Sequence, residues 1–128
     1  MTFLRDESAL AFDMLTDLTC VDFLGSEPLG SETRFEMVYH LYSVARNHRL
    51  RIKAYPVGEP PTIASLTGLW ASADWMEREV FDLYGIEFDD HPDLRRILLY
   101  EGFEGHPLRK DYPKTRRQPL IGPGSRGA

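Results

Sequence analysis

The sequence predicts a single domain that combines an antiparallel pair of strands with helices and ends in an extended, loop-rich segment. Residues 34–45 and 50–57 alternate apolar and polar side chains, which is typical of strands. Residues 72–84 repeat apolar side chains at steps of three and four, which is typical of an amphipathic helix. Five prolines interrupt the chain after residue 86, so we expect no long regular element there.

The N-terminal quarter predicts a helix and then a strand. Residues 3–17 indicate a short helix with an approach loop, for which Ser8 is a candidate N-cap. Residues 20–25 indicate a short strand that Gly25 ends, and residues 26–32 a turn-rich loop. With 128 residues, of which 42% are hydrophobic, the chain can bury one modest core.

The two predicted strands form a hairpin whose tight turn is "RNHR", residues 46–49. One face of the first strand is apolar and the other carries polar side chains, so one side of the sheet should meet solvent or a partner. Beyond the hairpin, residues 63–70 predict a short helix broken near Gly68. In the main helix, Asp74 and Glu77 have the spacing of a capping box, and Gly85 provides the C-terminal stop.

Charge is unevenly distributed along the chain. Residues 1–94 carry 7 basic and 17 acidic side chains, whereas residues 95–128 carry 8 basic and 3 acidic ones. The sequence therefore divides into an acidic core domain and a basic C-terminal segment that docks on something negative. It contains no nucleic-acid-binding motif, which argues against nucleic acid as that partner. The last residues, 120–128, have the composition of a frayed end.

A single cysteine, Cys20, excludes an internal disulfide and an iron–sulfur cluster held by four thiolates of this chain. It lies in an apolar run and should be buried, in a reducing, intracellular compartment. No apolar run approaches the ~20 residues of a membrane helix, and the charged N-terminus is unlike a signal peptide. The sequence also lacks the glycine-rich loops and nucleophile elbow of nucleotide-binding and hydrolytic enzymes.

The main helix concentrates charged side chains. Arg78 is four residues from both Asp74 and Asp82, which predicts an ion-pair network on the helix surface. An alternative is that Glu79 and Asp82, near neighbours on the helix, perform acid–base chemistry or bind a metal. The four histidines lack the i,i+4 spacing of a zinc site, and His91 and His106, which both precede proline, should stabilise turns.

The segments "EREVFDLYGIEFDDHPDLRRILL" (77–99) and "EGHPLRKDYP" (104–113) closely resemble the signature region of the 30 kDa subunit, or C subunit, of respiratory complex I, the proton-pumping NADH:quinone oxidoreductase. Upstream, "RFEMVYHLYSVARNHRLRIKAYPV" and "SLTGLWASADWMERE" follow in the expected order, so the resemblance covers roughly residues 3–115. It implies an α+β fold: a small, mainly antiparallel sheet flanked by helices, with an extended, loop-rich C-terminal segment.

The resemblance also implies a subunit with no catalytic centre of its own. The chain would bind no metal or cofactor, while other subunits carry FMN, iron–sulfur clusters and quinone. It would lie in the peripheral arm on the cytoplasmic face of the membrane and meet the membrane only through the complex. Its partners would be the 49 kDa-type subunit (the D subunit), along which the C-terminal segment extends, and other peripheral-arm subunits. The residues expected to position that interface are Glu77, Arg78, Glu79, Asp82, His91, Arg95, Arg96, Arg109, Lys110 and Tyr112.

Alternatives stay open at this point. Related membrane-bound hydrogenases and other quinone or ferredoxin oxidoreductases use homologous subunits. A small independent enzyme using Glu79 and Asp82, or a stand-alone module that binds an acidic ligand through residues 95–117, would also fit the charge pattern. Members of the family usually begin with a further strand and helix before the equivalent of Phe3, so we expect a shortened form or a fragment with an exposed sheet edge.

Overall fold

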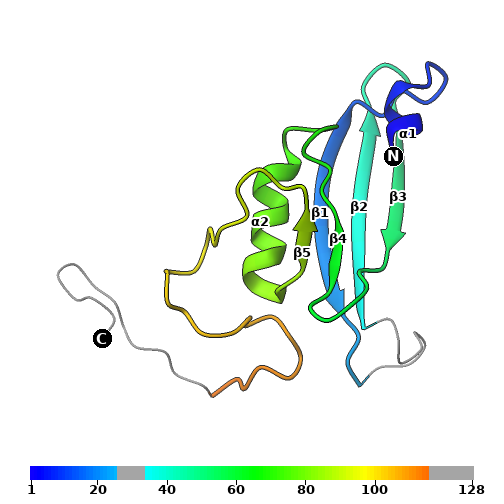
Figure 1. Ribbon diagram of the computed structural model, residues 1–128. Helices are drawn as coiled ribbons and strands as arrows, with labels where there is room; N and C mark the ends of the chain where they lie inside the picture. The colour runs from blue at the N-terminus through cyan, green and yellow to red at the C-terminus, as the bar shows by residue number, and fades with distance from the viewer. Residues whose placement is uncertain (26–33, 116–128) are drawn as a thin grey trace.

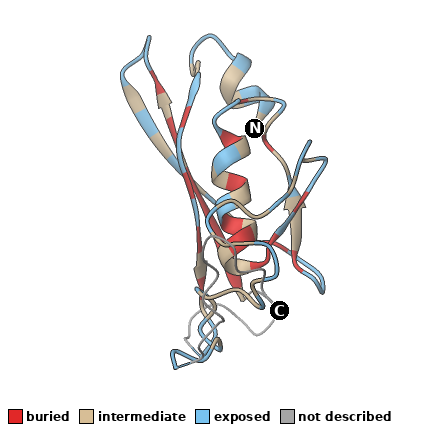
Figure 2. Cartoon of the chain, turned by 90° about the vertical axis from the view of Figure 1, so that its left-hand side faces the viewer, coloured by how far each residue is buried: buried red, intermediate tan, exposed pale blue. Residues whose placement is uncertain are grey.

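The computed structural model describes residues 1–25 and 34–115. Its main sheet has three antiparallel strands in the order β1 (Met14–Asp22), β2 (Phe35–Ser43) and β3 (His48–Ala54). The helix α2 (Ala73–Tyr84) lies against one face of this sheet, and the parallel pair β4 (Thr62–Ala64) and β5 (Glu87–Asp89) lies on the same side (Figures 1 and 2). A short helix, α1 (Thr2–Asp6), precedes the sheet.

The predicted α+β class is confirmed, and strand alternation explains where the core lies. Tyr39 in the central strand pairs with Leu18 of β1 and Ile52 of β3, so all three side chains point to the same face. That inner face meets the apolar side of α2, and the contact excludes water from the centre of the domain. The buried core cluster consists of Phe12, Leu15, Leu18, Cys20, Phe35, Met37, Tyr39, Leu41, Leu66, Trp70, Ala73, Val80, Ile86 and Phe88.

The prediction for residues 3–17 is wrong over most of its length. Only α1 is helical, Ser8 follows it in a turn, and β1 already begins at Met14. The positive φ of 46° at Ala11 breaks any continuous helix. A bulge between Leu15 and Asp17 also hides the two-residue alternation of β1, because one extra residue shifts the buried positions out of phase.

The predicted helix over residues 63–70 is also wrong. The chain forms β4 and then a single turn, in which the N–H groups of Leu69 and Trp70 both donate to the carbonyl of Leu66. The strand pairs in parallel with β5, which lies beyond α2, and a local pattern cannot reveal such a distant partner. The stretch after residue 86 therefore begins with a short strand that the sequence did not predict.

The prediction of α2 is confirmed, including its stop at Gly85, whose φ of 79° is left-handed. The capping box is wrong, since the N-cap is Ser72 and its hydroxyl donates instead to the carbonyl of Leu15 at 2.9 Å. No helix in the described ranges has both the length and the apolar character needed to cross a bilayer. The turn-rich loop and the frayed end predicted for residues 26–32 and 120–128 lie outside the described residues.

Candidate functional site

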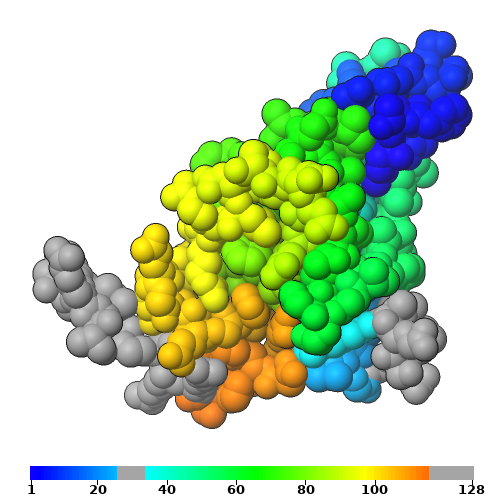
Figure 3. Space-filling model, viewed as in Figure 1, coloured from blue at the N-terminus to red at the C-terminus, as the bar shows by residue number. Residues whose placement is uncertain are grey.

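The chain after β5 returns to the C-terminal end of α2, and we call residues 93–112 the strap. In Figure 3 its yellow and orange atoms lie over α2 and reach the blue atoms at the end of β1. Although residues 97–112 contain no regular helix or strand, the strap is bound at several points to side chains and carbonyls of the domain. Those points include most of the residues that the sequence singled out.

Asp82 is the main anchor. Its side chain is completely buried, and Oδ1 accepts a hydrogen bond from Nη1 of Arg96 at 2.7 Å. Oδ2 accepts the N–H groups of three successive strap residues, Ile97, Leu98 and Leu99, at 3.2, 2.8 and 2.9 Å. Burial opposes ionisation of Asp82, but the Leu99 amide, Arg96 and the neighbouring amides outweigh it and lower the pKa of this carboxyl group.

The free carbonyls at the end of α2 form a second set of anchors. A helix leaves its last carbonyls without partners and carries a partial negative charge there. The strap supplies both donors and positive charge: the Leu108 N–H donates to the Leu83 carbonyl at 3.1 Å, and Nε of Arg109 donates to the Tyr84 carbonyl at 2.6 Å. Nδ1 of His106 lies 3.0 Å from the Asp82 carbonyl. Burial, together with Arg109 and Arg96, lowers the pKa of His106.

A third anchor holds the far end of the strap to the main sheet. Asp22, a buried residue at the end of β1, accepts two hydrogen bonds from Arg34, at 2.9 and 2.8 Å, and one from the Lys110 N–H at 2.8 Å. Burial opposes ionisation of this carboxyl group, but Arg34 and the amides of Lys110 and Leu24 bring its pKa down to about 2.

The remaining predicted residues fall into two groups. Arg78 does not pair with Asp74 or Asp82; its guanidinium donates to the carbonyls of Arg95 and Arg96, both at 3.1 Å. His91, whose side chain is fully buried, contacts Asp74 through Nε2 at 3.0 Å and accepts the Asp93 N–H through Nδ1. These residues join the start of the strap to the first half of α2. The prediction that His91 and His106 stabilise turns agrees with these contacts.

The other predicted residues do not converge on a common site. Glu77 is buried on the inner side, Glu79 and Arg95 are exposed, and Tyr112 stacks near Phe103 with 6.4 Å between ring centroids. The carboxylate pair of Glu79 and Asp82 does not form a site, because Asp82 is enclosed by its donors while Glu79 points to solvent. Among the described residues, no three His, Cys, Asp or Glu side chains gather as metal ligands would.

Sequence reasoning missed three exposed apolar side chains around the strap. Trp75 on α2 is 61% exposed, and Leu98 and Leu108 on the strap are 62% and 49% exposed. The Arg78 guanidinium lies over the Trp75 ring, 5.2 Å from its centroid, and the same guanidinium holds the strap backbone. Helical spacing already placed Trp75 off the apolar stripe of α2, and this was the signal that could have found it.

The chain matches a family of known proteins over most of its length. A family described as "Respiratory-chain NADH dehydrogenase, 30 Kd subunit" matches residues 1–118. The chain belongs to this family. It is 56% identical over 125 residues to the C subunit of NADH-quinone oxidoreductase from Trichlorobacter lovleyi, covering 97% of this chain and 69% of that protein. It is 52% identical over 111 residues to the C 2 subunit from Rhizobium meliloti, covering 87% and 58%. The chain thus spans between half and about two thirds of the length of these curated relatives.

Solved structures agree with the fold of this family member. A trypsin-resistant fragment (1–134) of Nqo5 matches with a TM-score of 0.60 at 38% identity, covering 67% of this chain and 68% of that one. A chain of an archaeal respiratory membrane complex, the membrane-bound sulfane sulfur reductase, matches with a TM-score of 0.67 at 21% identity, covering 89% and 68%. The second likeness concerns the fold alone.

Gly85 provides a direct test of how tightly the strap is seated in this member of the 30 kDa family. A Cβ atom there would lie 2.7 Å from Nη2 of Arg109 and from Cδ2 of His106, whereas Gly102 has a similar positive φ and open space around it. Both Gly→Ala changes introduce φ strain, but only Gly85→Ala displaces the strap. We expect Gly85→Ala to lower the free energy of unfolding by at least about 1 kcal/mol more than Gly102→Ala. Equal losses in urea denaturation would show that the strap is not packed on Gly85.

Acid should weaken the third anchor. The folded-state pKa of Asp22, about 2, lies below the ordinary 3.8. The ionised carboxylate therefore contributes fully to the free energy of unfolding above the ordinary pKa, and this contribution is lost as pH falls through about 2. We expect the wild-type free energy of unfolding to fall by about 2 kcal/mol more than that of Asp22→Asn between about pH 5 and about pH 2. Denaturation curves measured across this range check it, and parallel pH profiles for the two proteins would contradict it.

Glu77 should behave in the opposite way. Its carboxylate accepts the Ser65 hydroxyl at 2.6 Å and the Leu66 N–H at 2.8 Å, yet burial dominates and raises its pKa. The folded state therefore favours the protonated carboxyl group more than the unfolded state does. Above the ordinary pKa of glutamate, ionisation of Glu77 lowers the free energy of unfolding. We expect Glu77→Gln to be at least as stable as wild type at neutral pH, and Glu77→Ala to lose about 2 kcal/mol by leaving the Leu66 N–H unpaired. Thermal denaturation of both variants tests this, and a Glu77→Gln protein as unstable as Glu77→Ala would refute it.

Proposed function

We propose that this chain is a non-catalytic structural subunit of the peripheral arm of a proton-translocating NADH:quinone oxidoreductase. Its strap would be the element that packs against the 49 kDa-type subunit. The observation that carries the proposal is the strap itself, a segment without helix or strand that is fixed by Asp82, Asp22 and the end of α2. Relatives named as the C subunit of NADH-quinone oxidoreductase, at 50–56% identity, support this parent complex over a hydrogenase.

The strap has the composition of a protein interface. Trp75, Leu98 and Leu108 are large apolar side chains exposed on or beside it, and Arg78 and Arg95 lie among them. Tryptophan and arginine side chains commonly dominate binding energy where a partner covers them, and exposed leucines add apolar contact area. Because the segment that carries Leu98 and Leu108 is anchored, these side chains are held in place for contact with a partner.

The internal ion pairs define the role of the charged residues. Asp82, Arg96 and Arg109 shape the strap from within, and we propose that the exposed Glu79, Arg95 and the side chain of Lys110 face the partner. FMN, iron–sulfur clusters and quinone would be held by other subunits. The chain would lie on the cytoplasmic face of the membrane and reach the membrane only through the assembled complex.

Replacement of the exposed apolar side chains tests this function. We expect Trp75→Ala with Leu98→Ala to reduce co-purification with the other peripheral-arm subunits at least about tenfold, because hot-spot residues each contribute about 2 kcal/mol. The matched control is Phe3→Ala with Val57→Ala, which removes side chains that are 66% and 65% exposed and lie outside the strap. Undiminished co-purification of the first double variant, with an unchanged melting temperature, would rule the strap out as the docking element.

A further inference from the structure

The face of the main sheet turned away from α2 carries a group of basic side chains that the proposed function does not use. The outward positions of β3 are Arg49, Arg51 and Lys53, all exposed and all basic. They lie opposite Tyr42, His40 and Val38 of β2, respectively. Charged side chains on an edge strand discourage sheet-to-sheet association, and either sign would serve that purpose. Lys53 is paired with Glu36 of β2, with 3.5 Å between Nζ and Oε1, so Arg49 and Arg51 are the two cations of this strand that call for a more specific explanation.

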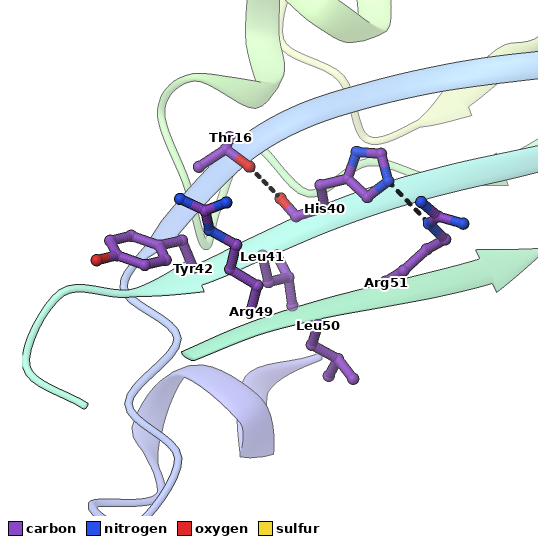
Figure 4. A pocket seen from close by; sticks show the side chains of 7 residues that line it. All are labelled: Thr16, His40, Leu41, Tyr42, Arg49, Leu50 and Arg51. Carbon is purple, nitrogen blue, oxygen red and sulfur yellow. Dashed lines mark hydrogen bonds between the residues drawn. The ribbon is translucent and has the colours of Figure 1, made fainter. Parts of the chain in front are cut away.

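A hollow of about 690 Å³ lies between these strands and β1. In Figure 4 the side chains of Thr16, His40, Tyr42, Arg49 and Arg51 rise from the same side of the sheet, while Leu50 projects away from them. Tyr42 and the Arg49 guanidinium lie toward one end of this row of side chains, and the Arg51 guanidinium lies at the other. The hollow is therefore open to solvent, and hydrogen-bonding groups share its lining with apolar parts of these side chains.

Contacts within the sheet hold these groups in place. The Tyr42 hydroxyl donates to Oδ1 of Asn47 at 2.8 Å, and the Arg49 guanidinium lies over the Tyr42 ring, 5.3 Å from its centroid. Nε of Arg51 donates to Nε2 of His40 at 3.1 Å, and this bond leaves the two terminal amino groups of the guanidinium for another acceptor. Tyr42 and His40 thus orient the two arginines, and Nδ1 of His40 lies 3.8 Å from Oδ2 of Asp17 on β1.

Neither arginine forms an ion pair within the part of the chain that the structure describes. Elsewhere in those ranges Arg5, Arg34, Arg95 and Arg96 are each matched to a carboxylate, and Arg46, Arg78 and Arg109 donate to backbone carbonyls. Met14, opposite Tyr42 and 45% exposed, adds an apolar contact beside the hollow. Two oriented arginines with a tyrosine and a methionine form a combination enriched at protein interfaces, and the guanidinium forks fit carboxylates.

We propose that the outer-face hollow formed by Thr16, His40, Tyr42, Arg49 and Arg51 binds an extended, acidic segment of a partner protein. Carboxylates of the segment would pair with the two guanidiniums, and an apolar residue at the Arg49 end would contact Tyr42 and Met14. This surface lies on the opposite side of the sheet from α2 and the strap. It would therefore form a second contact, independent of the strap.

Peptide binding to the full chain tests the proposal. The probe is a short fluorescein-labelled peptide in which glutamate alternates with valine, and the comparison peptide alternates lysine with valine; binding is followed by fluorescence anisotropy. We expect only the glutamate peptide to bind, with affinity that falls as salt rises. Arg49→Glu with Arg51→Glu should weaken it by about tenfold or more, because charge-assisted hydrogen bonds are lost.

The control carries the same charge change elsewhere: Arg5→Glu with Lys114→Glu should bind the glutamate peptide as the wild type does. Melting temperatures of both double variants verify folding, and Arg49→Gln with Arg51→Gln repeats the test without charge reversal. Equal weakening in the control would reduce the effect to net charge and overturn the proposal. So would peptide binding that survives Arg49→Glu with Arg51→Glu. Binding to phosphatidylglycerol vesicles or inorganic phosphate, without binding of the glutamate peptide, would overturn it in favour of another anion.

Discussion

The buried carboxylate of Asp82 is the interaction on which the C-terminal third of the described chain depends. One side chain neutralises Arg96 and also receives three consecutive backbone N–H groups. A segment without a helix or sheet ladder has to place its amide groups somewhere, and a buried amide without an acceptor costs as much as a lost hydrogen bond. Asp82 supplies the acceptor for three of these groups, and Leu83 and Asp22 accept the N–H groups of Leu108 and Lys110, so the strap can be ordered without secondary structure. Loss of either member of a buried ion pair typically costs about 3–5 kcal/mol.

The end of α2 adds a constraint of its own. Its last carbonyls and its dipole require donors and positive charge, and Gly85 opens the space in which Arg109 and His106 provide them. Helix, glycine and basic segment are thus one unit. The charge asymmetry of the sequence has a local meaning here, since Arg96 and Arg109 of the basic segment neutralise the acidic domain of the same chain.

Sequence reasoning succeeded where the signal is local and failed where it is not. Alternation located β2 and β3, helical spacing located α2, and the left-handed stop at Gly85 followed from residue type. The pairing of β4 with β5 was missed because α2 lies between the paired Thr62 and Glu87 in the sequence. Helical spacing placed Arg78 beside Asp82. In the structure both side chains form hydrogen bonds with the strap, which lies outside α2. Helical spacing cannot reveal partners that lie in a distant segment, so these contacts required the tertiary structure.

The anchoring of the strap at both ends has a consequence for the cost of association. A loose tail that becomes ordered on a partner gives up about 1–2 kcal/mol of backbone conformational entropy for each residue that is fixed. Here that entropy has already been lost during folding of the subunit, between the Asp82 anchor at Ile97 and the Asp22 anchor at Lys110. A partner would meet a preorganised surface, so the contacts formed by Leu98 and Leu108 could contribute to affinity with little loss to ordering.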